Sequence, residues 1–237
     1  MAAVIRPRFY SLFALMLAAV VLAGFARTFY LRYWFDVPPL TQLMYLHGLV
    51  FSAWVALFVV QTRLIAAHNY RAHMRLGIAG LVLAGLVFAV GLATVVVSAS
   101  AQRPRAMGMA SYQFVFVPFF VIVTFACLVT AAVLLRKRAP LHKRLMTLAM
   151  ITVLPPATAR LIALAGGTGH FLLLQTSATA VFVIVCLVYD WLKYRSIHPV
   201  YAIGGPLLVL SWPFRAWFAR TEAWAVVGKW MASLSAT

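Results

Sequence analysis

Residues 45–80 read YLHGLVFSAWVALFVVQTRLIAAHNYRAHMRLGIAG and carry the pattern that decides the fold. A first apolar run ends at Gln61 and Arg63, a short basic segment follows, and a second apolar run begins near Leu76. An apolar helix of about 20 residues is long enough to cross the hydrocarbon core of a bilayer. The stretch therefore predicts two membrane-spanning helices joined by a basic turn.

The composition of the whole chain agrees with a lipid environment. Of its 237 residues 65% are hydrophobic and only 10% are charged, whereas about a quarter of the residues of a soluble domain are charged. The formal charge of +17 comes from 20 Lys and Arg set against three acids. These cations lie mainly between apolar runs, where they orient the chain and meet anionic lipid headgroups. We expect the lipid bilayer to be the partner, and no nucleic acid.

The order of apolar runs predicts an all-α bundle of about seven transmembrane helices in a single membrane domain, 1–237. The first run is interpreted as an uncleaved helix and not as a signal peptide, because the remainder is membranous too. Pro155 and Pro156 predict a kink in the fifth span. Trp224, Val227 and Trp230 have helical spacing and predict an amphipathic surface helix at 221–231. The spans are expected at 9–26, 43–66, 76–98, 113–135, 145–164, 170–191 and 201–219. Cys127 and Cys186 fall inside apolar runs and are expected to be buried as small apolar side chains.

The basic residues also predict an orientation. With the N-terminus in the cytoplasm, twelve Lys and Arg fall in inner segments and six in outer segments. Cytoplasmic segments are enriched in these residues. We therefore expect a multi-pass protein of the inner (plasma) membrane with its C-terminus outside.

Under this topology, a single helix is followed by three hairpins whose inner turns each contain a histidine before the next span. The motifs are HMRLG at 73–77, HKRLM at 142–146 and HPVY at 198–201. One interpretation is that His73, His142 and His198 converge on a metal, a haem iron or a proton-carrying group. Asp190 would then orient an imidazole. The alternative is that each histidine anchors its span at the headgroups.

A second set of ionisable residues lies toward the outer side, namely His47, Arg160, His170 and Arg215. Ionisable residues in a membrane usually face the bundle interior and mark a site. If the four converge, two cations beside two imidazoles suit haem propionates or another anionic group. Alternatively, the arginines extend to water and His47 bonds a neighbouring helix.

Several of these motifs resemble an uncharacterised family of bacterial polytopic membrane proteins. The resemblance rests on His47, Trp54 and Gln61, on the two motifs HMRLG and HKRLM, on Asp190 with His198–Pro199, and on SWPFR at 211–215. It implies a topology without an activity. A further likeness is to cytochrome b561-type membrane cytochromes. It implies two haem b groups, with His47 and His170 as an outer pair and His73 and His142 as an inner pair. The fourth span has no histidine, unlike that family. The HKRLM motif also resembles small proteins of cytochrome oxidase maturation.

Two functional hypotheses follow. The first is a non-enzymatic assembly or maturation factor, or a subunit of a respiratory membrane complex that contacts other membrane subunits. The second is a redox protein that binds haem b or a transition metal and exchanges electrons with quinone. The sequence has no phosphate-binding glycine loop, no HExxH motif and no lysine in the seventh span for a retinal Schiff base. The cofactor and the question of enzymatic activity stay open.

Overall fold

The computed structural model describes residues 9–101 and 106–234, which are helical or irregular and contain no strand. The chain forms two compact units, Met1–Val90 and Gly91–Thr237, and each is described here by itself. The all-α prediction is confirmed for the described residues. The helix α3 (Tyr70–Ala99) crosses from the first unit into the second, and a single domain stays a prediction.

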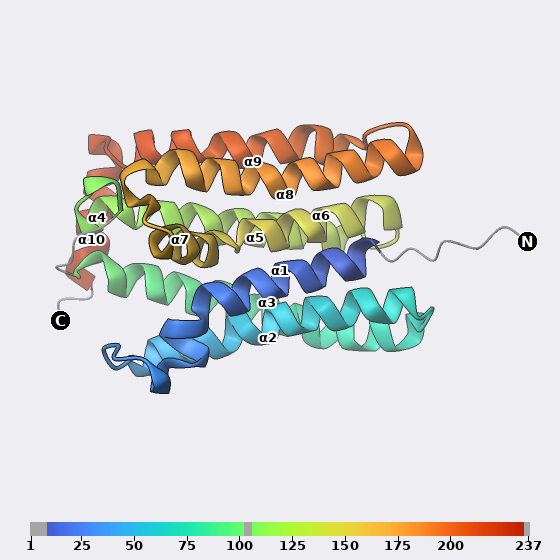
Figure 1. Cartoon of the computed structure of the whole chain (residues 1–237), viewed down its shortest axis with the longest axis horizontal. Coiled ribbons are helices and arrows are strands. Elements are labelled where there is room, and N and C mark those ends of the chain that lie inside the picture. The colour runs from blue at the N-terminus through green and yellow to red at the C-terminus, as the bar shows by residue number, and fades with distance from the viewer. Residues whose placement is uncertain (1–8, 102–105, 235–237) are drawn as a thin grey trace, which may run out of the picture. The chain divides into compact units, whose positions relative to one another are not determined.

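The first unit holds α1 (Phe9–Phe25), α2 (Gln42–Ala66) and the first part of α3 (Figure 1). The helix α2 begins where Thr41, following two prolines, accepts a hydrogen bond from the Met44 N–H at 3.3 Å. Such a side-chain cap satisfies one of the free donors at a helix start. The two helices pack together, and the Ser11 hydroxyl donates to the Thr62 carbonyl at 2.9 Å.

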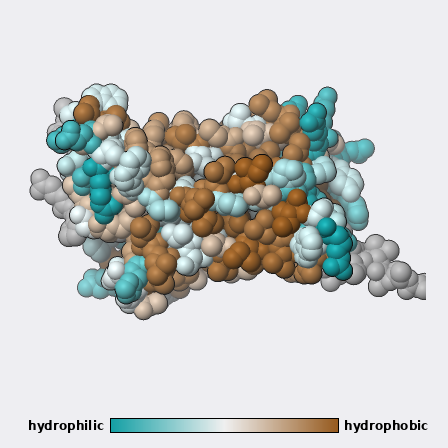
Figure 2. Space-filling model, turned by 90° about the horizontal axis from the view of Figure 1, so that it is seen from above, coloured by the Kyte–Doolittle hydropathy of each residue, from teal (hydrophilic) through white to brown (hydrophobic). Residues whose placement is uncertain are grey.

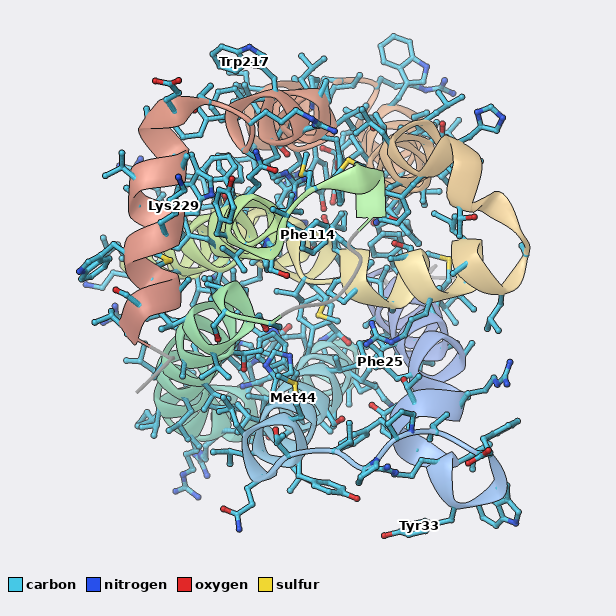
Figure 3. All side chains as sticks on the ribbon, turned by 90° about the vertical axis from the view of Figure 1, so that its left-hand side faces the viewer. Phe25, Tyr33, Met44, Phe114, Trp217 and Lys229 are labelled. Carbon is cyan, nitrogen blue, oxygen red and sulfur yellow. The ribbon has the colours of Figure 1, made fainter. Side chains whose placement is uncertain are left out.

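A short segment between α1 and α2 is held against α2. Arg32 donates to the Tyr45 hydroxyl at 2.9 Å and to the Pro38 carbonyl at 2.8 Å. Tyr33 is 87% exposed and points away from the ribbon (Figure 3). An exposed aromatic at a span end suits the boundary between membrane and water.

The second unit is built from antiparallel helices connected by short turns. The helix α5 packs on α6, and α8 packs on α9 along its length (Figure 1). Arg195 takes a positive φ of 55° at the end of α8, and Pro199 occupies the first turn of α9, where its missing N–H costs nothing. The elements of this unit, after α3, are α4 (Ser111–Phe114), α5 (Phe116–Leu134), α6 (Ala139–Thr152), α7 (Pro155–Leu164), α8 (Phe171–Tyr194), α9 (Pro199–Phe218) and α10 (Glu222–Leu234).

The predicted kink at the two prolines is confirmed. The helices α6 and α7 are bent by 41° at the break between them. The Ile151 carbonyl, which loses the N–H of Pro155, accepts from the Leu154 N–H at 3.2 Å. Two side chains add bonds on either side of the break: Thr152 donates to the Leu148 carbonyl at 2.9 Å, and the amide of Gln175 donates to the Pro155 carbonyl at 3.2 Å. Hydrogen bonds therefore hold this break in place inside the helix bundle.

Five helical segments of the described chain are long and apolar enough to cross a membrane, or six if the bent pair counts as one span. The predicted span at 201–219 is not among them, because prolines, glycines, Ser211 and Arg215 lower the hydropathy of α9. On the face that carries α8 and α9, apolar residues fill the middle and hydrophilic residues gather at the ends (Figure 2). The protein is thus an integral membrane protein with five or six candidate spans.

Two further expectations need correction or refinement. Cys186 is buried, but Cys127 is exposed, since it points away from the packed face of α5.

The helix expected at 221–231 is present as α10, yet its buried positions are Trp224, Gly228 and Met231. Trp224 donates to the Tyr112 carbonyl at 3.0 Å. A Cβ on Gly228 would lie 2.1 Å from the same oxygen, so only glycine permits this close approach. Figure 3 shows α10, labelled at Lys229, and α4, labelled at Phe114, at this end of the unit. A position of α10 on the membrane surface stays a prediction.

Candidate functional site

A buried ion pair joins α6 to α8 in the second unit. Arg144 donates from Nε to Asp190 Oδ2 at 2.8 Å and from Nη2 to Oδ1 at 2.7 Å. The two side chains are 4% and 0% exposed. Nη1 of Arg144 donates to the Pro140 carbonyl at 2.9 Å. A two-pronged arginine–carboxylate contact is among the stronger polar contacts in proteins.

The start of α9 meets this ion pair through His198. The backbone N–H of His198 donates to Asp190 Oδ2 at 3.2 Å, and its Nδ1 accepts from the Val200 N–H at 3.2 Å. Burial lowers the pKa of His198, as does the positive charge of Arg144 and Lys143, while Asp190 opposes them. The ring is thereby favoured in its neutral form, which alone can accept the capping bond. Asp190 thus contacts the backbone of His198, whereas the sequence suggested the imidazole.

Two tyrosines enclose the guanidinium of Arg144. Its carbon lies 5.3 Å from the ring centre of Tyr194 and 5.6 Å from that of Tyr201. Both distances are within the range of cation–π attraction. We call Arg144, Asp190, Tyr194, His198 and Tyr201 the ion-pair cluster. The cluster connects α6 with the end of α8 and the start of α9.

The other two inner histidines are bonded within their own hairpins. Nδ1 of His142 is 2.8 Å from the Ala132 carbonyl of α5. The Gln61 amide donates to Nδ1 of His73 at 2.7 Å in the orientation that satisfies both amide atoms. Both histidines lie inside the first turns of helices that begin earlier than expected. His73 belongs to the first unit, and His142 and His198 belong to the second.

Among residues 9–101 and 106–234, no group of three or more His, Cys, Asp or Glu is arranged to hold a metal ion. The metal site predicted at His73, His142, His198 and Asp190 stays a prediction.

The outer residues are likewise divided between the two units. His47, in the first unit, stacks on Phe51 with ring centres 4.1 Å apart. In the second unit, Arg160 donates to the Pro156 carbonyl at 2.8 Å, and His170 is exposed before α8. Each predicted haem pair, His47 with His170 and His73 with His142, takes one histidine from each unit. The pairs therefore stay predictions.

Arg215 is the buried member of the outer set. It is 4% exposed, and it donates to the carbonyl and the hydroxyl of Ser211 on its own helix, at 3.1 and 2.8 Å. Its guanidinium carbon lies 3.9 Å from the ring centre of Trp212. Its Nη1 atom is buried and has no hydrogen-bond partner. A desolvated cation–π contact contributes about 2 kcal/mol, less than the several kcal/mol that burying a cation costs.

A cavity of about 10 Å³ adjoins Arg215 at the level of the helix break. Residues from all five helices α5 to α9 line it, including Thr152, Pro155 and Thr179. The Trp212 indole N–H donates to the Thr179 hydroxyl at 2.9 Å, and this hydroxyl donates to the Gln175 carbonyl at 3.1 Å. We call Thr152, Thr179, Ser211, Trp212 and Arg215 the Arg215 cavity.

Gln175 of α8 forms hydrogen bonds with α7 next to this cavity. It is completely buried, and its amide nitrogen contacts the Thr158 hydroxyl at 2.6 Å as well as the Pro155 carbonyl. Its oxygen has no partner among the described residues. Sequence reasoning did not select Gln175, Thr179 or Arg144. A glutamine inside an otherwise apolar span was the available signal, because such a side chain needs a bonding partner in the membrane.

No protein-family model, curated protein or solved structure matches this chain. These comparisons identify no family for the chain. What the structure supports is a helical protein with five or six candidate membrane spans.

Proposed function

We propose that this protein is a non-enzymatic component of the bacterial inner membrane, either an assembly or maturation factor or a subunit of a membrane complex. In this proposal the N-terminus is cytoplasmic, α9 crosses the membrane as a seventh span, and the C-terminus lies outside. The respiratory complexes are the first assemblies to examine, because the HKRLM motif resembles proteins of cytochrome oxidase maturation.

The observation that carries the proposal is the engagement of Asp190. This carboxylate accepts two bonds from Arg144 and one from the His198 backbone. A carboxylate bound by three donors holds helices together and is poorly placed to carry protons or to ligate a metal. The neighbouring histidines are engaged in the same manner, His198 by capping α9 and His142 by contacting the Ala132 carbonyl. These contacts favour a role in architecture over one in chemistry.

The test has a spectroscopic and a hydrodynamic part. The protein is purified in a mild detergent, and its absorption is recorded before and after dithionite reduction, together with a metal analysis. We expect no Soret band and no stoichiometric transition metal. In digitonin extracts, the 26.2 kDa chain should migrate within a larger hetero-assembly whose other membrane subunits co-purify in fixed ratio.

A haem b difference spectrum, lost on His142→Ala, would overturn the proposal and favour the redox hypothesis. A chain that migrates alone in every extract, with unchanged membrane complexes in a deletion strain, would also contradict it.

A further inference from the structure

We propose that the Arg215 cavity is a binding site for one small monatomic anion, with chloride as the probe. The proposal does not depend on the function proposed above, since it rests on a different cluster of the second unit. Its starting point is a cation that is almost completely buried and whose Nη1 atom has no partner.

Among the residues that the structure describes, no acid forms an ion pair with Arg215. Both of its hydrogen bonds go to Ser211, and its aromatic neighbours are Trp212 and, at 5.5 Å, Phe120. Asp190, the acid buried in this unit, is engaged by Arg144. An ionised group in a medium of low dielectric constant requires a counter-charge. A water molecule would complete the hydrogen bonds of Arg215 but would leave its charge unbalanced, so an anion is the better occupant.

The size and the lining of the cavity define the ligand. A volume of about 10 Å³ is close to the minimum for one water-sized particle. A chloride ion is larger than a water molecule, so its binding requires the side chains that line the cavity to move outward. Phosphate, sulfate and lipid headgroups are larger than this volume, and the burial of Arg215 separates its guanidinium from the headgroups. Arg215, whose Nη1 has no hydrogen-bond partner, and the hydroxyl-bearing Thr124 line the cavity as possible donors. The hydroxyls of Thr152, Thr179 and Ser211 donate to backbone carbonyls of their own helices. A monatomic anion needs only such donors and no directional match.

The position of the cavity fits this assignment. It lies beside the break between α6 and α7, where Thr152 ends one helix and Pro155 begins the next. Membrane proteins commonly place small-ion sites where a helix is interrupted inside the bundle. The Trp212 ring on the guanidinium and its bond to Thr179 hold Arg215 toward the cavity.

The experiment measures radioactive chloride binding to the intact, detergent-solubilised protein at constant ionic strength, with gluconate as the replacing anion. We expect saturable binding of one chloride per chain and an unfolding midpoint that rises with chloride. Arg215→Met should weaken binding by about tenfold or more. Lys193→Met, which removes one exposed cation from the end of α8, is the matched control and should bind as the wild type does.

Two further measurements keep the test decisive if Arg215→Met does not fold. Bromide should quench the fluorescence of Trp212, and this quenching should disappear in Trp212→Phe. Ser211→Ala should retain the fold and change the chloride affinity. Absence of saturable chloride binding to the wild type would overturn the proposal, and so would unchanged affinity in a folded Arg215→Met protein.

Discussion

At the scale of single residues, the ion pair of Arg144 and Asp190 makes the sharpest stability prediction. Asp190→Leu leaves a buried guanidinium without its counter-charge and should destabilise the protein by about 3–5 kcal/mol. The double variant Arg144→Leu with Asp190→Leu should lose less than Asp190→Leu alone, because it leaves no unpaired charge. Unfolding in mixed micelles measures both effects.

The control for this cycle is Arg136→Ala, which removes an exposed cation near the same turn and should change stability by no more than about 0.5 kcal/mol. The cycle also needs the single variant Arg144→Leu. If the effects of Arg144→Leu and Asp190→Leu simply add in the double variant, the pair is not coupled and the prediction fails.

His198 makes a prediction about pH at the same cluster. Its pKa in the folded protein is lowered, chiefly by burial and then by Arg144 and Lys143, with Asp190 opposing. As the pH falls, the unfolded chain therefore binds a proton on His198 before the folded chain does. The contribution of the neutral ring is thus complete above the ordinary value near 6.5 and declines below it. Protonation of Nδ1 also removes the acceptor of the Val200 N–H.

The free energy of unfolding, measured from pH 8 to pH 5, should show this decline in the wild type. This range extends on both sides of the ordinary histidine pKa near 6.5. His198→Asn retains a capping acceptor without a titrating ring, and its stability curve should be flatter over the same range. A variant with an unaltered pH dependence would exclude His198 as the titrating group.

At the scale of elements, Gln175 connects α8 to the broken span. Its amide binds the Pro155 carbonyl, which begins α7, and the Thr158 hydroxyl one turn later. Gln175→Leu removes both bonds inside the bundle and should destabilise it by about 1–3 kcal/mol. Hydrogen exchange should show the loss first in α7. Thr176→Val is the control, because its hydroxyl bonds only the Leu172 carbonyl of its own helix. Equal effects of the two substitutions would show that Gln175 does not connect the helices.

The elements also show what a linear sequence can reveal. The apolar runs located most helix ends to within a few residues, although α3 and α6 begin six residues before the expected spans. The two prolines located the break, because hydropathy and the missing N–H of proline act locally. Arg144 and Asp190 are 46 positions apart, and no local pattern pairs them. Thr179 of α8 meets Trp212 of α9 only through the packing of these two helices, and Gln175 reaches the start of α7 in the same way. Pairing of this kind depends on which faces of the helices pack together, and a single sequence does not determine those faces.

At the scale of the whole molecule, α9 decides how many times the chain crosses the membrane. The helix α9 has too little hydropathy to count as a span by composition, yet it packs along α8, which does count. Buried contacts reduce the cost of its polar residues, since Ser211, Trp212 and Arg215 face the bundle and Leu207 and Leu210 are exposed. A helix that hides its polar face in protein can cross a bilayer with a modest mean hydropathy. We therefore expect α9 to span.

Two insertions of a fluorescent reporter that folds only in the cytoplasm distinguish the topologies. One is placed after Ser196, between α8 and α9, and the other after Leu234. With a cytoplasmic N-terminus and seven spans, the reporter after Ser196 is fluorescent and the one after Leu234 is dark. Six spans without α9 make both fluorescent, and five spans without α9 or the bent pair make both dark. Because the three topologies give three different patterns, any result other than fluorescence after Ser196 alone contradicts seven spans, and the excess of Lys and Arg in the inner segments would then need a different explanation.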